Sequence, residues 1–533
     1  MFKKILVANR SEIAIRVFRA ARELRIPSVG IYSAEDRLTL HRFNTRESYR
    51  IGEGKGPIEA YLDMDGIIRI AKQSGADAIH PGYGFLSENP DFARLCAESG
   101  ITFIGPSPEI MRRLGNKVEA RALAIKADVP VMPATEPLPH DGAEITRLAE
   151  SIGYPLMLKA SWGGGGRGMR VIEDESGLLD RVAAARREAQ AAFGNDEVYL
   201  EKLVGNARHV EVQIMGDSHG QVVHLFERDC TVQRRHQKIV ERAPAPYLSE
   251  QQRDEITSAA VRLAQSVQYC NAGTVEFLQD VDTGQFYFIE VNPRIQVEHT
   301  VTEQITGLDL VKSQIRIAAG ASIGDVDSSG IPAQEKISMR GAAIQCRVTT
   351  EDPRNSFIPD YGHIVAYRSP AGPGIRLDAG TAYSGAVIGR HYDSLLVKIT
   401  ASGVSEAEAT DRMLRGLSEF RVRGVETNLA FLRALLTDAR FINGEYNTRF
   451  VDESPELLEL PPDEGHGAQL LYYIGDVIVN GSAQVSGRKM PAVLKQPTAP
   501  IVDLQPPADG VRQILDRDGP KAVAEFMKSS KVP

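Results

Sequence analysis

Two glutamates occupy mirror-image positions in one predicted β-hairpin. Residues 273–278 and 285–292 are rich in β-branched and aromatic residues, and a turn-forming segment separates them. If the hairpin is symmetric about residue 283, Glu276 lies directly opposite Glu290. Like charges opposite each other destabilise a strand pair, the more so beside aromatic neighbours. A divalent cation bound by both glutamates would reverse that effect. The pair therefore indicates a hairpin whose two strands share a binding site for a cation.

A third oxygen ligand, Asn292, lies two residues beyond Glu290 and therefore projects from the same strand face. Carboxylate and amide oxygens are hard ligands that suit Mg²⁺ or Mn²⁺ rather than zinc. The sequence predicts a divalent-metal site at Glu276, Glu290 and Asn292. The alternative is two solvated glutamates on an exposed hairpin face.

Polar residues continue at every second position beyond the hairpin, as Arg294, Gln296 and Glu298. Pro293 excludes a regular central strand here, but these side chains can still line one polar floor. Arg294 could hold a small anion, and Glu298 could act as a base beside it. The alternative is an edge strand with a solvated face.

A glycine-rich segment follows a short apolar strand that ends in Lys159. Residues 163–168 read Gly-Gly-Gly-Gly-Arg-Gly, a run that costs backbone entropy on ordering. Its bare N–H groups favour a phosphate, but the lysine precedes the glycines, so the segment is not a Walker A loop. We expect a phosphate-binding loop, with a flexible surface hairpin as the alternative. A second strand at 198–203 ends in polar residues, which suits an adenine slot or, equally, an exposed strand end.

A polar, basic run covers residues 228–238. Such a run is usually a solvated loop, and near a nucleotide it could supply counter-charge. The sequence shows no Cys–His arrangement that would make Cys230 a nucleophile, so we expect Cys230 to be a small packing residue. Taken alone, His209 is most often a structural histidine.

The N-terminal segment alternates strands with helices. An apolar strand at 4–8, an amphipathic helix at 11–24 and a strand at 27–32 predict a βαβ unit with a parallel sheet. A third strand at 77–80 opens into a glycine-rich loop, and ligands usually lie at this carboxyl end of parallel strands. The first turn lacks GxGxxG, so a dinucleotide fingerprint is absent.

Composition places the chain among globular proteins. Its 533 residues are 42% hydrophobic and 25% charged, with a net charge of −8, which allows roughly three or four domains and excludes collagen and bulk disorder. The mild acidic excess gives no indication of nucleic acid or an anionic membrane. Its four cysteines contain no CxxC, which argues against a disulfide framework or a zinc site. No segment has the ~20 apolar residues that span a bilayer, so we expect a cytoplasmic protein, or one of the mitochondrial matrix if a transit peptide has been removed.

The chain resembles the biotin carboxylases of the ATP-grasp superfamily over about residues 1–450. The matching motifs are 4–10 (KILVANR), 80–88 (HPGYGFLSE), Lys159 with 163–168, 227–238, and 290–299 (EVNPRIQVEH). More narrowly, it resembles the N-terminal part of the pyruvate carboxylase family in residues 357–362, 374–378 and 514–523. Acyl-CoA carboxylases usually carry Pro-Ser where this chain has Pro359-Asp360.

This resemblance implies an α/β protein: an ATP-grasp fold with an N-terminal Rossmann-like pre-ATP-grasp domain and a C-terminal biotin carboxylase α+β domain. The implied boundaries are 1–115 for the N-terminal domain, 116–335 for the ATP-grasp domain and 336–450 for the C-terminal domain. A mobile glycine-rich lid is implied at about 135–204, which would exclude water when closed. Residues 451–533 would be a linker and the start of an allosteric central region.

The resemblance also implies roles for individual residues. ATP would be bound by Lys117, Lys159, Gly164, Gly165, Gly166, His209, Gln233 and His236, with Glu201, Lys202 and Leu278 framing the adenine. Glu276, Glu290 and Asn292 would bind two Mg²⁺ ions. Bicarbonate would be held by Lys238, Arg294, Gln296 and Val297, and Glu298 would deprotonate it. Arg347 would stabilise the enolate-like oxygen of biotin, whose ring would lie near Tyr83.

The implied function is the ATP- and Mg²⁺-dependent carboxylation of biotin by bicarbonate through carboxyphosphate, which is one half-reaction of pyruvate carboxylation. Biotin would arrive on a separate carrier domain, and the carboxyltransferase domain would also lie outside this chain. We expect a homodimer through this part, a tetramer in the full enzyme, and no nucleic-acid or membrane partner. Alternatives are the biotin carboxylase subunit of an acetyl-CoA or propionyl-CoA carboxylase, another ATP-grasp ligase such as a carbamoyl phosphate synthase, and a nucleotide-binding regulatory module.

Overall fold

Five parallel strands form the first sheet of this computed structural model, which describes residues 1–162, 169–459, 474 and 477. The strands are β1 (Ile5–Val7), β2 (Ser28–Tyr32), β3 (Glu47–Arg50), β4 (Ala78–His80) and β5 (Thr102–Phe103), in the order β3-β2-β1-β4-β5. The helices of this region are α1 (Ser11–Glu23), α2 (Leu40–Phe43), α3 (Pro57–Tyr61), α4 (Met64–Ser74), α5 (Pro90–Glu98) and α6 (Pro108–Gly115). The predicted βαβ unit is confirmed, because α1 joins β1 to β2 and these two strands pair in parallel.

The buried faces of this sheet follow from its sequence. All three residues of β1 are apolar and fully buried, as expected for a parallel strand covered on both faces. α1 turns Ile13 and Val17 inward at helical spacing. β3 escaped prediction because its sequence, Glu-Ser-Tyr-Arg, lacks the apolar alternation that indicates a strand.

An eight-stranded antiparallel sheet carries the predicted metal ligands Glu276, Glu290 and Asn292, in the order β13-β12-β9-β10-β11-β14-β21-β19. Its strands are β9 (Ala207–Gly216), β10 (Val222–Arg234), β11 (Gln237–Ala243), β12 (Asn271–Asp280), β13 (Phe286–Asn292), β14 (Ala342–Thr349), β19 (Ile375–Ala379) and β21 (Leu395–Gly403). Because β11 pairs with β14, strands from the middle and the last third of the chain form one continuous sheet.

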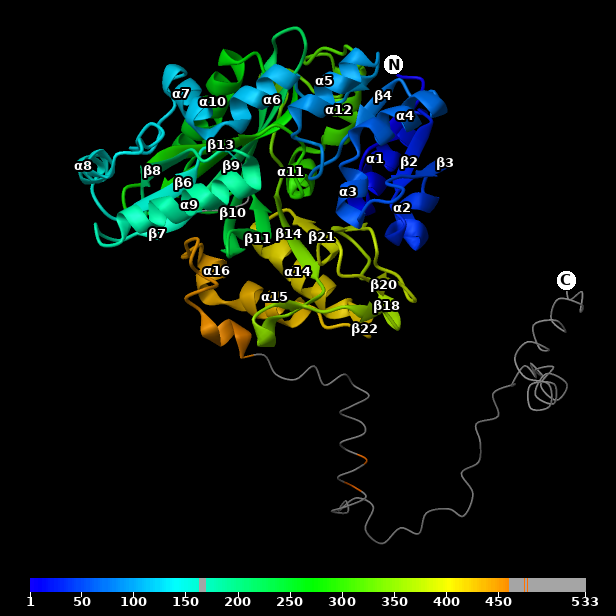
Figure 1. Cartoon of the computed structure of the whole chain (residues 1–533). Helices are drawn as coiled ribbons and strands as arrows, with labels where there is room; N and C mark the ends of the chain where they lie inside the picture. Colours follow the sequence, from blue (N-terminus) through cyan, green and yellow to red (C-terminus); the bar gives the residue numbers. More distant parts are fainter. Residues whose placement is uncertain (163–168, 460–473, 475–476, 478–533) are drawn as a thin grey trace, which may run out of the picture. The chain divides into compact units, whose positions relative to one another are not determined.

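A separate three-stranded sheet contains the strands on either side of the glycine-rich segment. It consists of β6 (Leu156–Ala160), β7 (Arg170–Ile172) and β8 (Val198–Lys202), in the order β7-β6-β8. Helices α8 (Gly142–Ile152) and α9 (Leu178–Phe193) lie beside this sheet (Figure 1) and share a hydrophobic core with it. The predicted strands that end near Lys159 and Lys202 are therefore antiparallel neighbours. The predicted phosphate-loop residues Gly164, Gly165 and Gly166 lie outside the described residues.

The remaining helices lie against the sheets or follow them in the chain. They are α7 (Lys117–Lys126), α10 (Glu250–Ser266), α11 (His299–Thr306), α12 (Leu310–Ala318), α13 (Val326–Ser329), α14 (Glu406–Glu419), α15 (Leu429–Thr437) and α16 (Ala439–Asn443), with 3₁₀ helices at Glu35–Leu38, Gln334–Lys336, Pro353–Asn355 and Pro455–Leu458. Short strands are β15 (Glu351–Asp352), β16 (Ile358–Pro359), β17 (Gly362–His363), β18 (Ala366–Arg368), β20 (Val387–Ile388) and β22 (Arg421–Arg423).

The chain divides into two units, residues 1–461 and 462–533. Most of the second unit, and with it most of the predicted linker at 451–533, lies outside the described residues. Within the part of the chain that the structure describes, no helix combines the length and apolar character needed to cross a membrane.

Candidate active site

The β12–β13 hairpin places Glu276 directly opposite Glu290, as its sequence symmetry predicts. Thr274 pairs with Asn292 two residues further along the ladder. The register shifts between Glu276 and Phe277, so the symmetric pairing ends at the glutamates. Such an irregularity is common beside active sites, because it changes the direction in which side chains project.

Lys238, at the start of β11, connects three buried carboxylates. Its Nζ lies 2.6 Å from Glu211 Oε2, 2.9 Å from Glu276 Oε1 and 2.8 Å from Glu298 Oε1. Burial alone would lower the pKa of Lys238, but the three carboxylates outweigh burial and hold that pKa well above its usual range. The lysine is therefore a fixed cation at the centre of the site.

Glu298 is held as a carboxylate. Burial would raise its pKa, but the positive charges of Lys238, Arg347 and Arg228 lower the pKa below its ordinary value. Arg347, from β14, reaches the second oxygen, with Nη2 3.1 Å from Glu298 Oε2. Arg347 Nε also donates to Glu241 Oε1 at 2.6 Å, which fixes the guanidinium in place.

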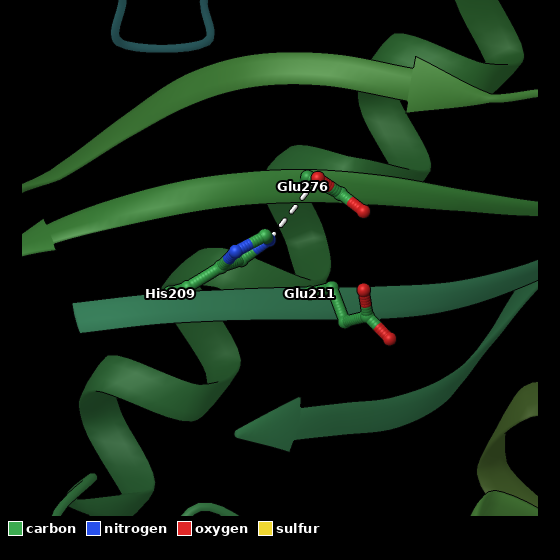
Figure 2. Close-up of side chains that lie close together, drawn as sticks. All are labelled: His209, Glu211 and Glu276. Carbon is green, nitrogen blue, oxygen red and sulfur yellow. Dashed lines mark ion pairs between the residues drawn. The ribbon is translucent and has the colours of Figure 1, made fainter. Parts of the chain in front are cut away.

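Glu211, which was not among the predicted site residues, also belongs to this cluster. Figure 2 shows His209 of β9 turned toward Glu276 on the neighbouring strand, and Glu211 on the same strand as His209. The ligand atoms of these three side chains lie within 4.8 Å of one another, and His209 Nε2 is 3.1 Å from Glu276 Oε2. The available signal was polar residues at alternate positions, His209, Glu211 and Gln213, in an otherwise apolar strand.

Arg228 supports the same carboxylates from within the sheet. It is fully buried, and its Nε donates to Glu211 Oε1 at 2.5 Å. The guanidinium also donates to Gln296 Oε1 at 2.8 Å, and Gln296 in turn donates to Glu276 Oε1 at 3.0 Å. Three further hydrogen bonds reach Gln213, Thr274 and Thr302.

Among the described residues, no regular strand continues beyond the hairpin, as Pro293 predicts. β13 ends at Asn292, and residues 293–298 are irregular up to the start of α11. Arg294 turns toward Glu88 Oε1, at 2.6 Å, and toward Asn292 Oδ1, at 2.9 Å. Asn292 Nδ2 is buried without a hydrogen-bond partner among the described residues. Glu88, the last residue of the matching motif at 80–88, is thus a neighbour of the site.

Lys117 connects the β12–β13 hairpin with the strand that bears Lys159. Lys117 Nζ lies 3.8 Å from Glu290 Oε2, and the Lys117 backbone N–H donates to Ser161, just beyond β6. Lys159 forms an ion pair with Glu201 of β8. Lys202 instead donates to two backbone carbonyls before β6, those of residues 153 and 154, both at 2.9 Å.

The other selected residues are more dispersed. Leu278 pairs with His209 across β12 and β9, and Gln233 pairs with Lys238 across β10 and β11. His236 is exposed in the turn between β10 and β11. Val297 and Tyr83 both lie close to Lys398. The Lys398 Nζ donates to Val297 O at 2.9 Å and lies 5.8 Å from the Tyr83 ring centroid. Cys230 is fully buried, and burial raises the pKa of its thiol, which fits packing rather than nucleophilic chemistry.

The oxygen donors of the hairpin fit a divalent cation. Burial raises the pKa of Glu290, and among charged neighbours Lys117 opposes this while Glu276 and Glu88 add to it. A bound cation would relieve that repulsion. The carboxylates of Glu276 and Glu290, with the amide of Asn292, are the ligand types that Mg²⁺ takes.

Known families match this chain in three consecutive parts. The family described as "Biotin carboxylase, N-terminal domain" matches residues 1–111, "Carbamoyl-phosphate synthase L chain, ATP binding domain" matches residues 116–326, and "Biotin carboxylase C-terminal domain" matches residues 345–453. Pyruvate carboxylase of Staphylococcus aureus is 52% identical over 99% of this chain and 46% of the relative. Human mitochondrial pyruvate carboxylase is 51% identical over 99% of this chain and 44% of the relative. The chain thus spans about half the length of these curated relatives.

Solved structures agree with these matches. Rhizobium etli pyruvate carboxylase, with the allosteric activator acetyl coenzyme A, has a TM-score of 0.84 at 58% identity, over 99% of this chain and 47% of that one. The biotin carboxylase domain dimer of Hydrogenobacter thermophilus 2-oxoglutarate carboxylase, with MgADP, ADP and bicarbonate, has a TM-score of 0.83 at 44% identity, over 86% of this chain and 99% of that one. The predicted ATP-grasp architecture and the predicted resemblance are both confirmed. Because it covers nearly the whole of a biotin carboxylase domain at this identity, the chain belongs to the biotin carboxylase family.

Proposed function

We propose that this chain carboxylates biotin with bicarbonate at the expense of ATP, through carboxyphosphate. The observation that carries the proposal is the contact of Lys238 with both Glu276 and Glu298. Lys238 thus connects Glu276, a carboxylate suited to bind a metal ion, with Glu298, a carboxylate suited to act as a base. The same ammonium group can also bind an anionic substrate. A nucleotide-binding module would not need that arrangement.

ATP binding would involve residues of α7, of the three-stranded sheet and of the eight-stranded sheet. Lys117, Lys159, His209, Gln233 and His236 would contact the nucleotide phosphates and ribose, together with Gly164, Gly165 and Gly166 of the glycine-rich segment. Glu201, Lys202 and Leu278 would frame the adenine. In support, Lys117 hydrogen-bonds to the end of β6, so it lies beside the strand that carries Lys159.

Glu276, Glu290 and Asn292 would hold Mg²⁺, or Mn²⁺ in its place. When bound, the cation neutralises charge on the phosphoryl group that is transferred. The protein supplies the remaining counter-charge through Lys117 and Lys159, which are positioned before the substrate arrives.

Bicarbonate would bind to Lys238, Arg294, Gln296 and Val297. As Lys238 and Arg294 turn their N–H donors toward this anion, Glu298 loses part of the positive field that lowers its pKa. Glu298 then becomes a stronger base when its substrate is in place, and it takes the bicarbonate proton. The bicarbonate oxygen attacks the γ-phosphorus, the bond to the ADP oxygen breaks, and carboxyphosphate forms.

Carboxyphosphate then divides into CO₂ and phosphate, and the phosphate takes the N1 proton of biotin. Arg347 would stabilise the negative oxygen of the resulting biotin enolate, while Tyr83 packs near the biotin ring. The N1 atom attacks CO₂ and carboxybiotin forms. Water has to be excluded throughout, and the separately packed α8–α9 lobe, within the predicted lid at 135–204, suits a closing element.

The wider assignment extends the same proposal. It includes domain boundaries at 115/116, 335/336 and 450/451. It also includes a homodimer, a tetramer of the full protein, and a location in the cytoplasm or the mitochondrial matrix. Pyruvate is the proposed final acceptor because the curated relatives are pyruvate carboxylases. Biotin would be presented by a carrier domain and its carboxyl group passed to a carboxyltransferase domain.

ADP release tests the proposal. Wild type should release ADP from MgATP in a bicarbonate-dependent manner that free biotin stimulates, and Glu298→Gln should abolish that stimulation. Turnover indifferent to biotin would contradict the assigned acceptor. Stimulation that survives in Glu298→Gln would contradict the assigned base.

A further inference from the structure

Two buried side chains form hydrogen bonds with the backbone turn that carries Glu298. Lys398 Nζ donates to Val297 O at 2.9 Å, and His299 Nδ1 lies 2.7 Å from Gln296 O. Because a carbonyl oxygen only accepts, the proton of this histidine resides on Nδ1. Lys398 and His299 are both fully buried. The side chains of Gln296 and Glu298 point instead to the carboxylate cluster.

Lys398 occupies a strand position that is directly registered with the catalytic arginine. On β21 it pairs with Arg347 of β14 on one side and with Asp378 of β19 on the other. Directly paired residues project from the same sheet face. Two neighbouring cations therefore meet two neighbouring residues of one turn: Arg347 contacts the Glu298 carboxylate, and Lys398 contacts the Val297 carbonyl.

The counter-ion of Lys398 comes from the N-terminal sheet region. Glu12, in the first turn of α1, places Oε2 3.2 Å from Lys398 Nζ. Both carboxylate oxygens of Glu12 are buried without a hydrogen bond among the described residues. A buried carboxylate with no hydrogen bond is costly unless a cation compensates it, so the Glu12 carboxylate depends on the charge of Lys398.

We infer that Lys398, with Glu12 as its counter-ion, is a positioning residue that fixes the Val297 carbonyl and thereby the location of Glu298. The ammonium also lies 5.8 Å from the Tyr83 ring centroid, within the range of a cation–π contact. One buried cation would thus set the base relative to the biotin-facing tyrosine. The inference rests on the proposed function, but the turn can be observed without turnover.

Two variants of the full chain test the inference. Lys398→Met removes the hydrogen bond to Val297 and leaves Glu12 without its cation. Burial raises the pKa of Glu12 to about 7, although Lys398 opposes the shift, so the isolated carboxyl can become neutral in this variant. The double variant Glu12→Gln/Lys398→Met removes both charges of this pair and keeps the test valid if the single variant folds poorly. Lys55→Met, which removes a surface ion pair with Asp63, is the matched control.

A positioning role predicts a specific kinetic pattern. A displaced reacting group costs about a hundredfold in rate, so kcat for biotin-dependent ADP release should fall by about that factor in both Lys398 variants. KM for ATP should stay within about twofold, since the groups that would bind ATP are unchanged. Amide hydrogen exchange of residues 296–300 should accelerate, while β14 and β21 keep their protection. The control should match wild type.

Other outcomes would overturn the inference. Wild-type kcat in either Lys398 variant would do so, as would unchanged exchange at residues 296–300. A general loss of protection with a parallel rise in KM for ATP would show a merely structural role. If wild type itself has no biotin-dependent turnover, the proposed function fails, and the exchange comparison alone then decides whether Lys398 holds the turn.

Discussion

Lys238 Nζ lies 2.8 Å from Glu298 Oε1, so the central cation of the site contacts the carboxylate that we propose as the base. This contact keeps Glu298 ionised before the reaction. If Glu298 is the base, the same contact makes it weak until an anionic substrate draws Lys238 away. The proposal thus links substrate binding to activation of the base through one ammonium group.

Replacement of Lys238 by Met should destabilise the fold and abolish turnover. Three buried carboxylates lose their shared cation, and removal of one partner of a buried ion pair costs about 3–5 kcal/mol. Urea denaturation followed by circular dichroism should show a loss of that order in the free energy of unfolding. Lys55→Met, at the surface, should cost less than about 1 kcal/mol. Equal losses in the two variants would contradict the assigned network.

Stability should decrease in acid. Glu276 and Glu298 have pKa values below the ordinary 4.5, because their cationic neighbours outweigh burial. A carboxyl whose pKa is lower in the folded chain adds stability that is complete above its unfolded pKa and is lost as the pH falls. The free energy of unfolding should therefore decline as the pH is lowered from about 5 toward about 3. Glu298→Gln should show a shallower decline, and an unchanged slope in that variant would count against the ion pairs.

Glu290→Gln should weaken Mg²⁺ binding specifically. It removes a proposed ligand with little change in size, and losses around a metal site cost about tenfold or more in affinity. The apparent KM for Mg²⁺ in ADP release should rise by at least that factor, and a higher Mg²⁺ concentration should restore much of the rate. Glu47→Gln makes the same chemical change in β3, where Glu47 pairs with Lys4, and should have no such effect. Failure of Mg²⁺ to rescue Glu290→Gln would exclude this glutamate as a ligand.

Arg347→Lys should separate the two halves of the reaction. Lysine retains a positive charge near Glu298 but cannot reproduce the fork that reaches both Glu241 and Glu298. If Arg347 stabilises the biotin enolate, biotin-stimulated ADP release should fall by about a hundredfold. The slower, biotin-independent ADP release should change little. A parallel loss of both rates would place Arg347 in the first step instead.

The sequence predicts the parts of this site that depend on local pattern. The register of Glu276 with Glu290 follows from hairpin symmetry, and the βαβ start follows from apolar periodicity. Glu211 was missed although polar residues alternate with apolar ones around it in β9, and Arg228 was noted only as part of a basic run. In both cases the residues that give the side chain its place in the site lie elsewhere in the sequence. The role of a buried charged residue can be inferred only when its charged and polar neighbours in the folded chain are known.

The same limit applies to Lys398. Nothing near it in sequence indicates that its ammonium reaches Val297, about a hundred residues earlier, or Glu12 on the first helix. The predicted floor beyond Asn292 shows the reverse case. Gln296 and Glu298 do meet the cluster, and they do so through the irregular backbone that Pro293 predicts.

The most direct test follows oxygen from bicarbonate. With bicarbonate labelled at all its oxygens with ¹⁸O, attack on the γ-phosphorus should place a single labelled oxygen in each phosphate released during biotin-stimulated turnover. Mass spectrometry of the phosphate, measured before bicarbonate exchanges its oxygens with water, gives the answer. Labelled phosphate would establish carboxyphosphate formation at the Lys238–Glu298 site when Glu298→Gln shows none, and phosphate that carries oxygen only from water would contradict the account.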